Sequence, residues 1–191
     1  MITFVRRRTL RELREASPLT GLPGNTRVCR EITRRITNGM PLAVCYVDID
    51  RFKSVNDSYG FVRGDELILF VAQLLRKFRG KAFLGHLGGD DFVVICAPEA
   101  VAPLFAEVTS AFEREAPRFY DPADAQRGHI TSIDRQGHEQ QWEIVTLSIG
   151  VATAEHRVFH DAVEIVAVAA EMKNVAKSLP GTQVCVDRRR G

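Results

Sequence analysis

The chain has 191 residues, of which 45% are hydrophobic and 26% are charged, as is typical of one globular domain with a substantial core. Its net charge of +2 is too small for a dedicated nucleic-acid-binding protein, so we expect no nucleic-acid partner. No apolar run approaches the ~20 residues of a membrane span, and the four scattered cysteines indicate neither a zinc site nor a disulfide framework. We therefore expect a cytoplasmic protein with no membrane segment in this sequence.

The first predicted element is a short charged helix over residues 5–16, VRRRTLRELREA. A helix this polar at the start of a chain is more typical of a connection to a preceding domain than of a core element. We accordingly divide the sequence into an N-terminal connecting helix (1–16), one folded domain (17–187) and a basic C-terminal tail (188–191).

Turn residues and apolar periodicity then predict the elements up to a central hairpin. In chain order these are a turn-rich segment at 17–25, a helix to Thr37, a strand over 42–49, helices over 52–59 and 65–78 with a turn at 60–64, and strands over 83–87 and 92–97. The hairpin is indicated by Gly88-Gly89-Asp90-Asp91 between the last two strands, because glycine adopts positive φ readily.

The second half alternates helices with shorter strands. In order we expect a helix over 101–116, a polar stretch over 117–141 that resembles an added hairpin or loop, a core strand over 145–151, an alanine-rich helix over 161–177 and a short strand over 184–186. Segments 130–133 and 142–149 are expected to pair across 134–137. Helices mixed with strands and at least one hairpin predict an α+β, two-layer fold with a central, mainly antiparallel sheet flanked by helices.

Three carboxylates stand out because they adjoin apolar strands. Asp48 lies near the end of a buried strand, where burying a carboxylate costs roughly several kcal/mol of folding free energy unless it is paired or binds a cation. The alternative for Asp48 is a helix cap, a role for which Asp50 is the better candidate. Asp90 and Asp91 occupy the hairpin turn, where aspartate is also common for local reasons. If the hairpin lies beside the 42–49 strand, the carboxylates converge into an oxygen-rich site suited to Mg²⁺ or Mn²⁺.

Several sequence blocks, in order and with matching spacing over residues 17–187, closely resemble the GGDEF family of diguanylate cyclases. They are Pro18-Leu19-Thr20-Gly21-Leu22-Pro23, Val47-Asp48-Ile49-Asp50-Arg51-Phe52-Lys53, Asn56-Asp57, Gly64-Asp65, Gly88-Gly89-Asp90-Asp91-Phe92 and Leu147-Ser148-Ile149-Gly150-Val151. The resemblance implies a palm-like sheet related to that of adenylyl cyclases and polymerases. It also implies the condensation of two GTP molecules into cyclic di-GMP by two facing subunits of a homodimer.

The resemblance also implies roles for individual residues. Metal ligands match Asp48 and Asp90, assisted by the Ile49 carbonyl, and Asp91 takes the second acidic position of the signature, which makes Asp48, Asp90 and Asp91 the catalytic set. Substrate-binding positions are matched by Asn56 and Asp65 at the guanine edge, by Phe52 and Lys53 through backbone N–H groups at the terminal phosphates, and by Lys177 at a phosphate. For Lys177 the alternative is an exposed cation favoured by the dipole at the C-terminus of its helix.

Departures from the family pattern leave two hypotheses open. Asp91 replaces a glutamate and is one methylene shorter, and His86 stands where arginine is usual. Arg79 matches the arginine of the inhibitory site, but Ala82 stands where its acidic partner is expected. We therefore consider an active, GTP- and Mg²⁺-dependent cyclase and, as the alternative, a weak or inactive module. Such a module would bind GTP or cyclic di-GMP and regulate an attached sensory or phosphodiesterase domain in a longer protein.

Overall fold

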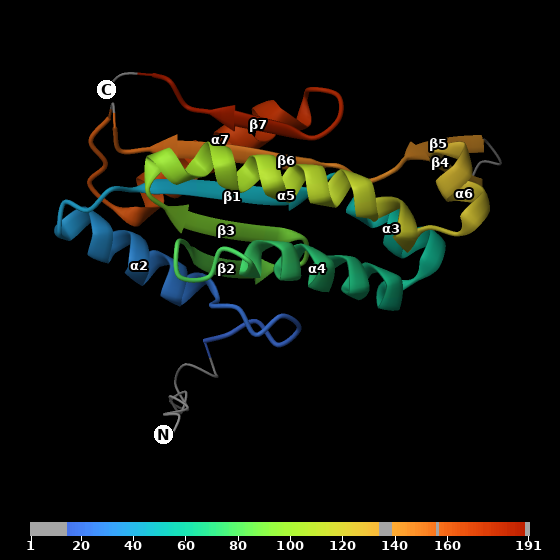
Figure 1. Ribbon diagram of the computed structural model, residues 1–191, viewed down its shortest axis with the longest axis horizontal. Coiled ribbons are helices and arrows are strands. Elements are labelled where there is room, and N and C mark those ends of the chain that lie inside the picture. The colour runs from blue at the N-terminus through green and yellow to red at the C-terminus, as the bar shows by residue number, and fades with distance from the viewer. Residues whose placement is uncertain (1–14, 134–138, 156, 190–191) are drawn as a thin grey trace.

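The fold is built on a five-stranded sheet, whose strands run in Figure 1 from β7 near the top to β2 below. The computed structural model describes residues 15–133, 139–155 and 157–189. The strand order is β2-β3-β1-β6-β7, with β1 at Ala43–Ile49, β2 at Phe83–Gly88, β3 at Asp91–Cys96, β6 at Leu147–Thr153 and β7 at Gln183–Val186. All neighbouring strands are antiparallel except β6 and β7, which are parallel. The predicted α+β fold with a mainly antiparallel sheet is confirmed.

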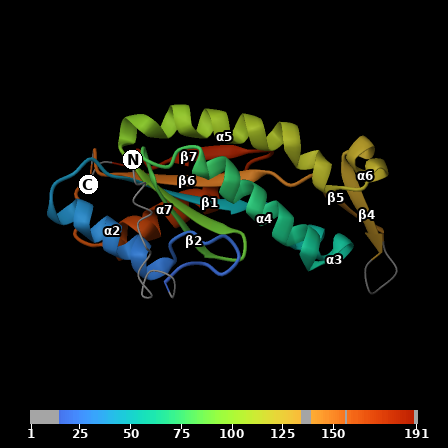
Figure 2. The same ribbon diagram turned by 60° about the horizontal axis from the view of Figure 1, so that its bottom comes forward.

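Two pairs of helices cover the two faces of the sheet (Figures 1 and 2). On one face lie α4 (Phe61–Arg76) and α5 (Val101–Glu115), and on the other lie α2 (Asn25–Thr37) and α7 (Ala162–Lys177). Each face has its own apolar cluster, so the central strands are buried on both sides. This explains why the 42–49 run is continuously apolar rather than alternating.

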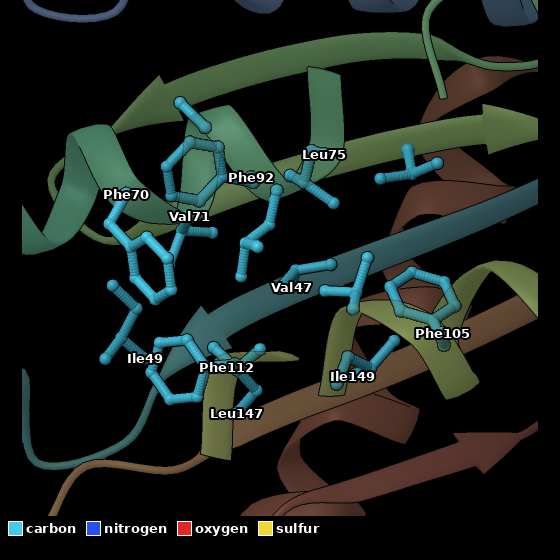
Figure 3. Close-up of a cluster of buried hydrophobic side chains, with 14 of the residues drawn as sticks. Val47, Ile49, Phe70, Val71, Leu75, Phe92, Phe105, Phe112, Leu147 and Ile149 are labelled. Atoms are coloured by element: carbon cyan, nitrogen blue, oxygen red, sulfur yellow. The ribbon is translucent and has the colours of Figure 1, made fainter. Parts of the chain in front are cut away.

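The alternation of side chains along β1 assigns each residue to one face. Val47 and Ile49 pack with the α4 and α5 side chains, as Figure 3 shows. Val44 belongs to the cluster under α2 and α7. By the same alternation, Tyr46 and Asp48 face α7, so the one carboxylate of the strand points toward a helix and not into the α4–α5 core.

The predicted boundary between the two helices after β1 is wrong. Helix α3 spans Phe52–Tyr59 and α4 already begins at Phe61, so the expected 60–64 turn is reduced to Gly60. Gly60 has a φ of 83°, a left-handed value that breaks the helix within one residue. Gly64, which the sequence predicts as a turn residue, lies inside α4.

The polar stretch after α5 is a small substructure at one end of the molecule (Figure 1). It contains, in order, a 3₁₀ turn, a short helix and a hairpin: η2 at Ala116–Phe119, α6 at Pro122–Arg127, β4 at His129–Ile133 and β5 at Glu139–Glu143. A further 3₁₀ turn, η1 at Pro98–Ala100, precedes α5. Ile130 pairs with Trp142 as expected, but β5 stops at Glu143 and does not continue into the core strand. The reason is that 147–153 pairs with β1 in the main sheet, and one strand cannot follow both.

The ends of the sequence are described only in part. The expected helix over 5–16 lies outside the described residues except for Glu15 and Ala16, and Ala16 forms an isolated bridge with Pro23 instead of a helical turn. Of the basic tail, Arg189 is held by the carboxylates of Asp187 and Glu171. None of the helices in the described ranges is long and apolar enough to cross a bilayer.

Candidate active site

The predicted carboxylates meet at the end of the sheet where β1 finishes and the β2–β3 hairpin turns. Val47 is opposite Phe92 in the antiparallel pairing, so Asp48 and Asp91 continue the two strands toward the same end. The hairpin closes with Gly88 opposite Asp91, leaving Gly89 and Asp90 as the turn. The hairpin prediction is therefore confirmed, and its register brings the carboxylates of two strands together.

Asp48 is buried, with 4% of its surface exposed, and is paired with two lysines of α7. Lys177 Nζ lies 2.6 Å from Asp48 Oδ2, and Lys173 Nζ lies 3.3 Å from Asp48 Oδ1. A buried carboxylate is tolerated only with such compensation. Although burial acts against its charge, Lys177 has a raised pKa because Asp48, Asp50 and Asp90 favour the ammonium form.

Crowding of like charges perturbs the two hairpin carboxyl groups. Burial raises the pKa of Asp90, and the negative charges of Asp48 and Asp91 raise it further. Burial also raises the pKa of Asp91, with Lys173 acting in the opposite direction and Asp48 adding to the rise. A site that holds its carboxylates this close together attracts cations, because a cation removes the repulsion between them.

The helix-cap alternative for Asp48 and Asp50 is wrong. The N-cap of α3 is Arg51, in a left-handed conformation with φ of 60°, and no side-chain cap bond is formed within the described residues. The Asp50 carboxylate instead accepts hydrogen bonds from Thr146 and Ser148, at 2.7 and 2.8 Å. Asp50 thus anchors the β1–α3 loop to the start of β6, whereas Asp48 pairs with Lys173 and Lys177.

The N-terminus of α3 lies directly after the site, as expected for Phe52 and Lys53. Phe52 is partly buried against the core and Lys53 is exposed. The first-turn N–H groups of a helix have no partner within the helix and form a ready anion site. This placement agrees with a phosphate role but does not test it.

Asn56 and Asp65 come from different helices, α3 and α4, and the Asn56 side chain lies against Gly64, the residue before Asp65. The buried Oδ1 atom of Asn56 accepts no hydrogen bond from the described residues. A Cβ added to Gly64 would lie 1.9 Å from that oxygen, so the glycine is what admits the amide. Asp65 is exposed one residue further along α4. The α3–α4 junction thus carries an exposed carboxylate near a partly buried amide, and the guanine role of Asn56 and Asp65 stays a prediction.

The donor set fits a magnesium or manganese ion that is completed by substrate. No group of three or more His, Cys, Asp or Glu side chains in the described ranges is arranged to hold a metal ion by itself. Mg²⁺ does not need one, since it is commonly held by one or two carboxylates with water and substrate phosphates. Asp48 Oδ2 is buried 2.6 Å from Lys177 Nζ, and Asp91 Oδ1 is buried 3.7 Å from Lys173 Nζ, so both oxygens already face a cation. Asp48, Asp90 and the Ile49 carbonyl therefore remain the predicted ligands.

Two of the departures from the family pattern, at His86 and near Arg79, have different structural settings. His86 is buried and joins the 17–23 turn to the hairpin: Nδ1 lies 2.7 Å from Ser17 Oγ and 3.0 Å from Thr20 Oγ1, and Nε2 lies 2.8 Å from the Gly89 carbonyl. Nε2 is therefore the protonated nitrogen, and His86 acts as a structural link. Arg79 is exposed after α4, where its backbone bridges Ala82. Its inhibitory role stays a prediction.

Lys173 is the site residue that the sequence reasoning missed. Besides its contact with Asp48, its ammonium lies 3.7 Å from Asp91 Oδ1 and 4.7 Å from the centre of the Tyr46 ring. The signal was available, because Lys173 and Lys177 are four residues apart and share one face of a helix. Burial and the nearby Asp91 carboxylate raise the pKa of the Tyr46 phenol to about 12.

Comparisons with known proteins place the chain in a family. The model of the family described as "Diguanylate cyclase, GGDEF domain" matches residues 17–181. Diguanylate cyclase DgcP of Pseudomonas aeruginosa is 40% identical over 83 residues, which cover 41% of this chain and 12% of DgcP. Cyclic di-GMP phosphodiesterase PdeB of Shewanella oneidensis is 35% identical over 86 residues, which cover 44% of this chain and 10% of PdeB.

The chain thus matches only about a tenth of the length of these curated relatives. Among solved structures, the GGDEF domain of DgcB from Caulobacter crescentus in complex with c-di-GMP has a TM-score of 0.68 at 21% identity, covering 94% of this chain and 97% of that one. At that identity the likeness concerns the fold alone. The match of the family model over residues 17–181 shows that the chain belongs to the GGDEF family of diguanylate cyclase domains.

Proposed function

We propose that this domain is a diguanylate cyclase that condenses two GTP molecules into cyclic di-GMP across a homodimer. The observation that carries the proposal is the group of carboxylates at the end of β1 and the start of β3, beside the open N-terminus of α3. Two phosphodiester bonds form and two pyrophosphates leave, so the site must hold a triphosphate and favour ionisation of an attacking hydroxyl. Divalent ions supply that charge stabilisation when bound.

Each site residue has a role that its position supports. Asp48, Asp90 and the Ile49 carbonyl would hold Mg²⁺ or Mn²⁺, and Asp91 faces the same space from the start of β3. The N–H groups of Phe52 and Lys53 would bind the terminal phosphates with the help of the helix dipole. The Lys177 ammonium, 40% exposed at its side chain, can reach a phosphate from the end of α7.

Recognition of guanine would fall to α3 and α4. The Asp65 carboxylate can accept from the N–H groups of the base, and the Asn56 amide can add one further contact to its edge. Because two subunits must each present one GTP, the dimer is part of the proposal. An attached sensory or phosphodiesterase domain would supply control in the longer protein.

One observation favours the alternative of a weak or inactive module that binds GTP or cyclic di-GMP. Lys173 places a second ammonium on Asp48, next to the shorter Asp91 side chain. This arrangement neutralises the carboxylates before any divalent ion arrives. A module of this kind would keep nucleotide binding and lose turnover.

The deciding experiment is an assay of the purified 191-residue chain with GTP and Mg²⁺ over a range of protein concentrations, with cyclic di-GMP measured by chromatography. In the cyclase proposal, product forms faster than in proportion to protein concentration, because the active species is a dimer. Asp48→Ala abolishes it. If GTP binds and no product forms at any concentration at which the chain is dimeric, the regulatory alternative replaces the proposal.

A further inference from the structure

Lys173 is partly buried, and its ammonium lies within the acidic site. Only 14% of its side chain is exposed, compared with 40% for Lys177 on the next helical turn. Its ammonium is 3.3 Å from Asp48 Oδ1 and 3.7 Å from Asp91 Oδ1, so it lies between the carboxylates of two neighbouring strands. The Tyr46 ring completes its surroundings at 4.7 Å. Such enclosure of a cation by two carboxylates and a ring face is strong compensation for burial.

The backbone holds this lysine in place. A Cβ built on Gly150 of β6 would lie 2.0 Å from the Lys173 backbone nitrogen and 2.1 Å from the Ala169 carbonyl oxygen. Helix α7 therefore lies against the sheet at closest approach where Lys173 begins. The Lys173 side chain therefore starts where α7 lies against β6, and its ammonium reaches Asp48 on the neighbouring strand β1.

The two lysines consequently differ in their freedom to leave the site. Lys177 is the last residue of α7 and is well exposed, so it can turn toward solvent or a phosphate. Lys173 is four residues from the helix end, and moving its ammonium away would remove a buried pair from Asp48 and Asp91. A divalent ion that binds Asp48 needs the same carboxylate oxygens and meets a fixed positive charge there.

We propose that Lys173 is a resident counter-cation of the acidic site, which stabilises Asp48 and Asp91 in the metal-free domain and competes with the divalent ion for Asp48. This inference rests on the metal site in the proposed function. It makes the affinity of the domain for Mg²⁺ or Mn²⁺ lower than its carboxylates alone would give. Lys173 affects metal binding through Asp48 and does not itself contact the metal or the substrate, so it is a positioning residue.

The test is a titration of the whole chain with Mn²⁺ in the absence of nucleotide. The concentration of free Mn²⁺ is measured from its electron paramagnetic resonance signal. Lys173→Met keeps the length of the stem and removes the charge, and it should bind Mn²⁺ on the order of tenfold more tightly, equivalent to about 1.4 kcal/mol. Lys173→Arg retains the charge and should bind as weakly as the wild type. Lys77→Met, at an exposed lysine after α4, is the matched control and should leave the affinity unchanged.

A second measurement guards against loss of folding. Each variant is first unfolded thermally without metal, and Lys173→Gln replaces Lys173→Met if the latter does not fold. Mn²⁺ should raise the midpoint more in the neutral variant than in the wild type, because a ligand stabilises the state that it binds more tightly. Equal or weaker Mn²⁺ binding in the neutral variant overturns the inference.

The outcomes also separate this inference from the proposed function. Asp48→Asn in the Lys173→Met background should abolish the tighter binding, and its persistence would show that the ion binds elsewhere and overturn the competition. Tighter, Asp48-dependent binding with no cyclic di-GMP formed supports the inference while the cyclase proposal fails. If no variant binds Mn²⁺, both the metal site and the role of Lys173 are overturned.

Discussion

Replacement of Gly64 by alanine should weaken GTP binding while leaving the fold stable. The new methyl group would lie 1.9 Å from Asn56 Oδ1 and 3.0 Å from Asn56 Cγ, so the amide must rotate away. Its other close neighbour is Phe52 Cζ at 3.1 Å, which a shift of a few tenths of an ångström relieves. The clash is with the movable end of a side chain and not with backbone. The substitution should therefore displace the Asn56 side-chain amide and leave the helix in place.

The magnitudes separate binding from stability. Alanine in a helix interior is favoured over glycine by up to about 1 kcal/mol, which offsets the cost of moving Asn56 and Phe52, so the free energy of unfolding should change by less than ~1 kcal/mol. Loss of one or two neutral hydrogen bonds from the amide to guanine, at ~1 kcal/mol each, corresponds to GTP binding weakened by roughly 5- to 30-fold. Calorimetric titration and urea unfolding measure the two quantities.

A double-mutant cycle with Asn56→Ala provides the control. If the methyl group acts only through the amide, Gly64→Ala should add little to the loss of GTP affinity already caused by Asn56→Ala. Full additivity of the two losses would refute the reasoning about the contact. Unchanged GTP affinity in Asn56→Ala itself would refute the guanine role of the amide.

Three further substitutions test the surrounding structure. Gly150→Ala places a methyl group 2.0 Å from the Lys173 backbone nitrogen, where nothing flexible can yield, and should cost ~1–3 kcal/mol in urea unfolding, with a loss below ~0.5 kcal/mol contradicting the close approach of α7. The hydrogen bond from Arg189 lowers the pKa of Asp187 against the effect of burial, so its contribution is present above the unfolded value of ~3.9 and lost as pH falls through the lowered pKa. The stability deficit of Asp187→Asn should therefore shrink between pH ~7 and pH ~3, and a constant deficit would count against the ion pair. His86→Ala leaves buried polar partners unpaired, and should cost ~1–3 kcal/mol and speed hydrogen exchange over residues 17–23, whereas unaltered exchange there would show that the histidine does not hold the turn.

Much of the fold follows from local pattern. The apolar run ending in Asp48 required a strand buried on both faces, and the glycines before Asp91 required a hairpin. The start of α4 did not follow, because Gly60 alone makes the break and the 61–64 segment has no strong signal. Similarly, β5 ends at Glu143 because the following segment, β6, pairs with β1 in the main sheet. That pairing joins segments far apart in the sequence, so local pattern does not predict it.

Sequence patterns and the family blocks predict Asp48, Asp90 and Asp91 for the acidic site, and Asn56 and Asp65 for contact with the base. How the acidic charges are compensated depends on how the whole chain packs. Helix α7 comes from more than a hundred residues further along the chain, and its approach over Gly150 brings Lys173 between the carboxylates. Spacing within a helix can show that Lys173 and Lys177 share a face, but which surface that face meets depends on packing across the whole sheet.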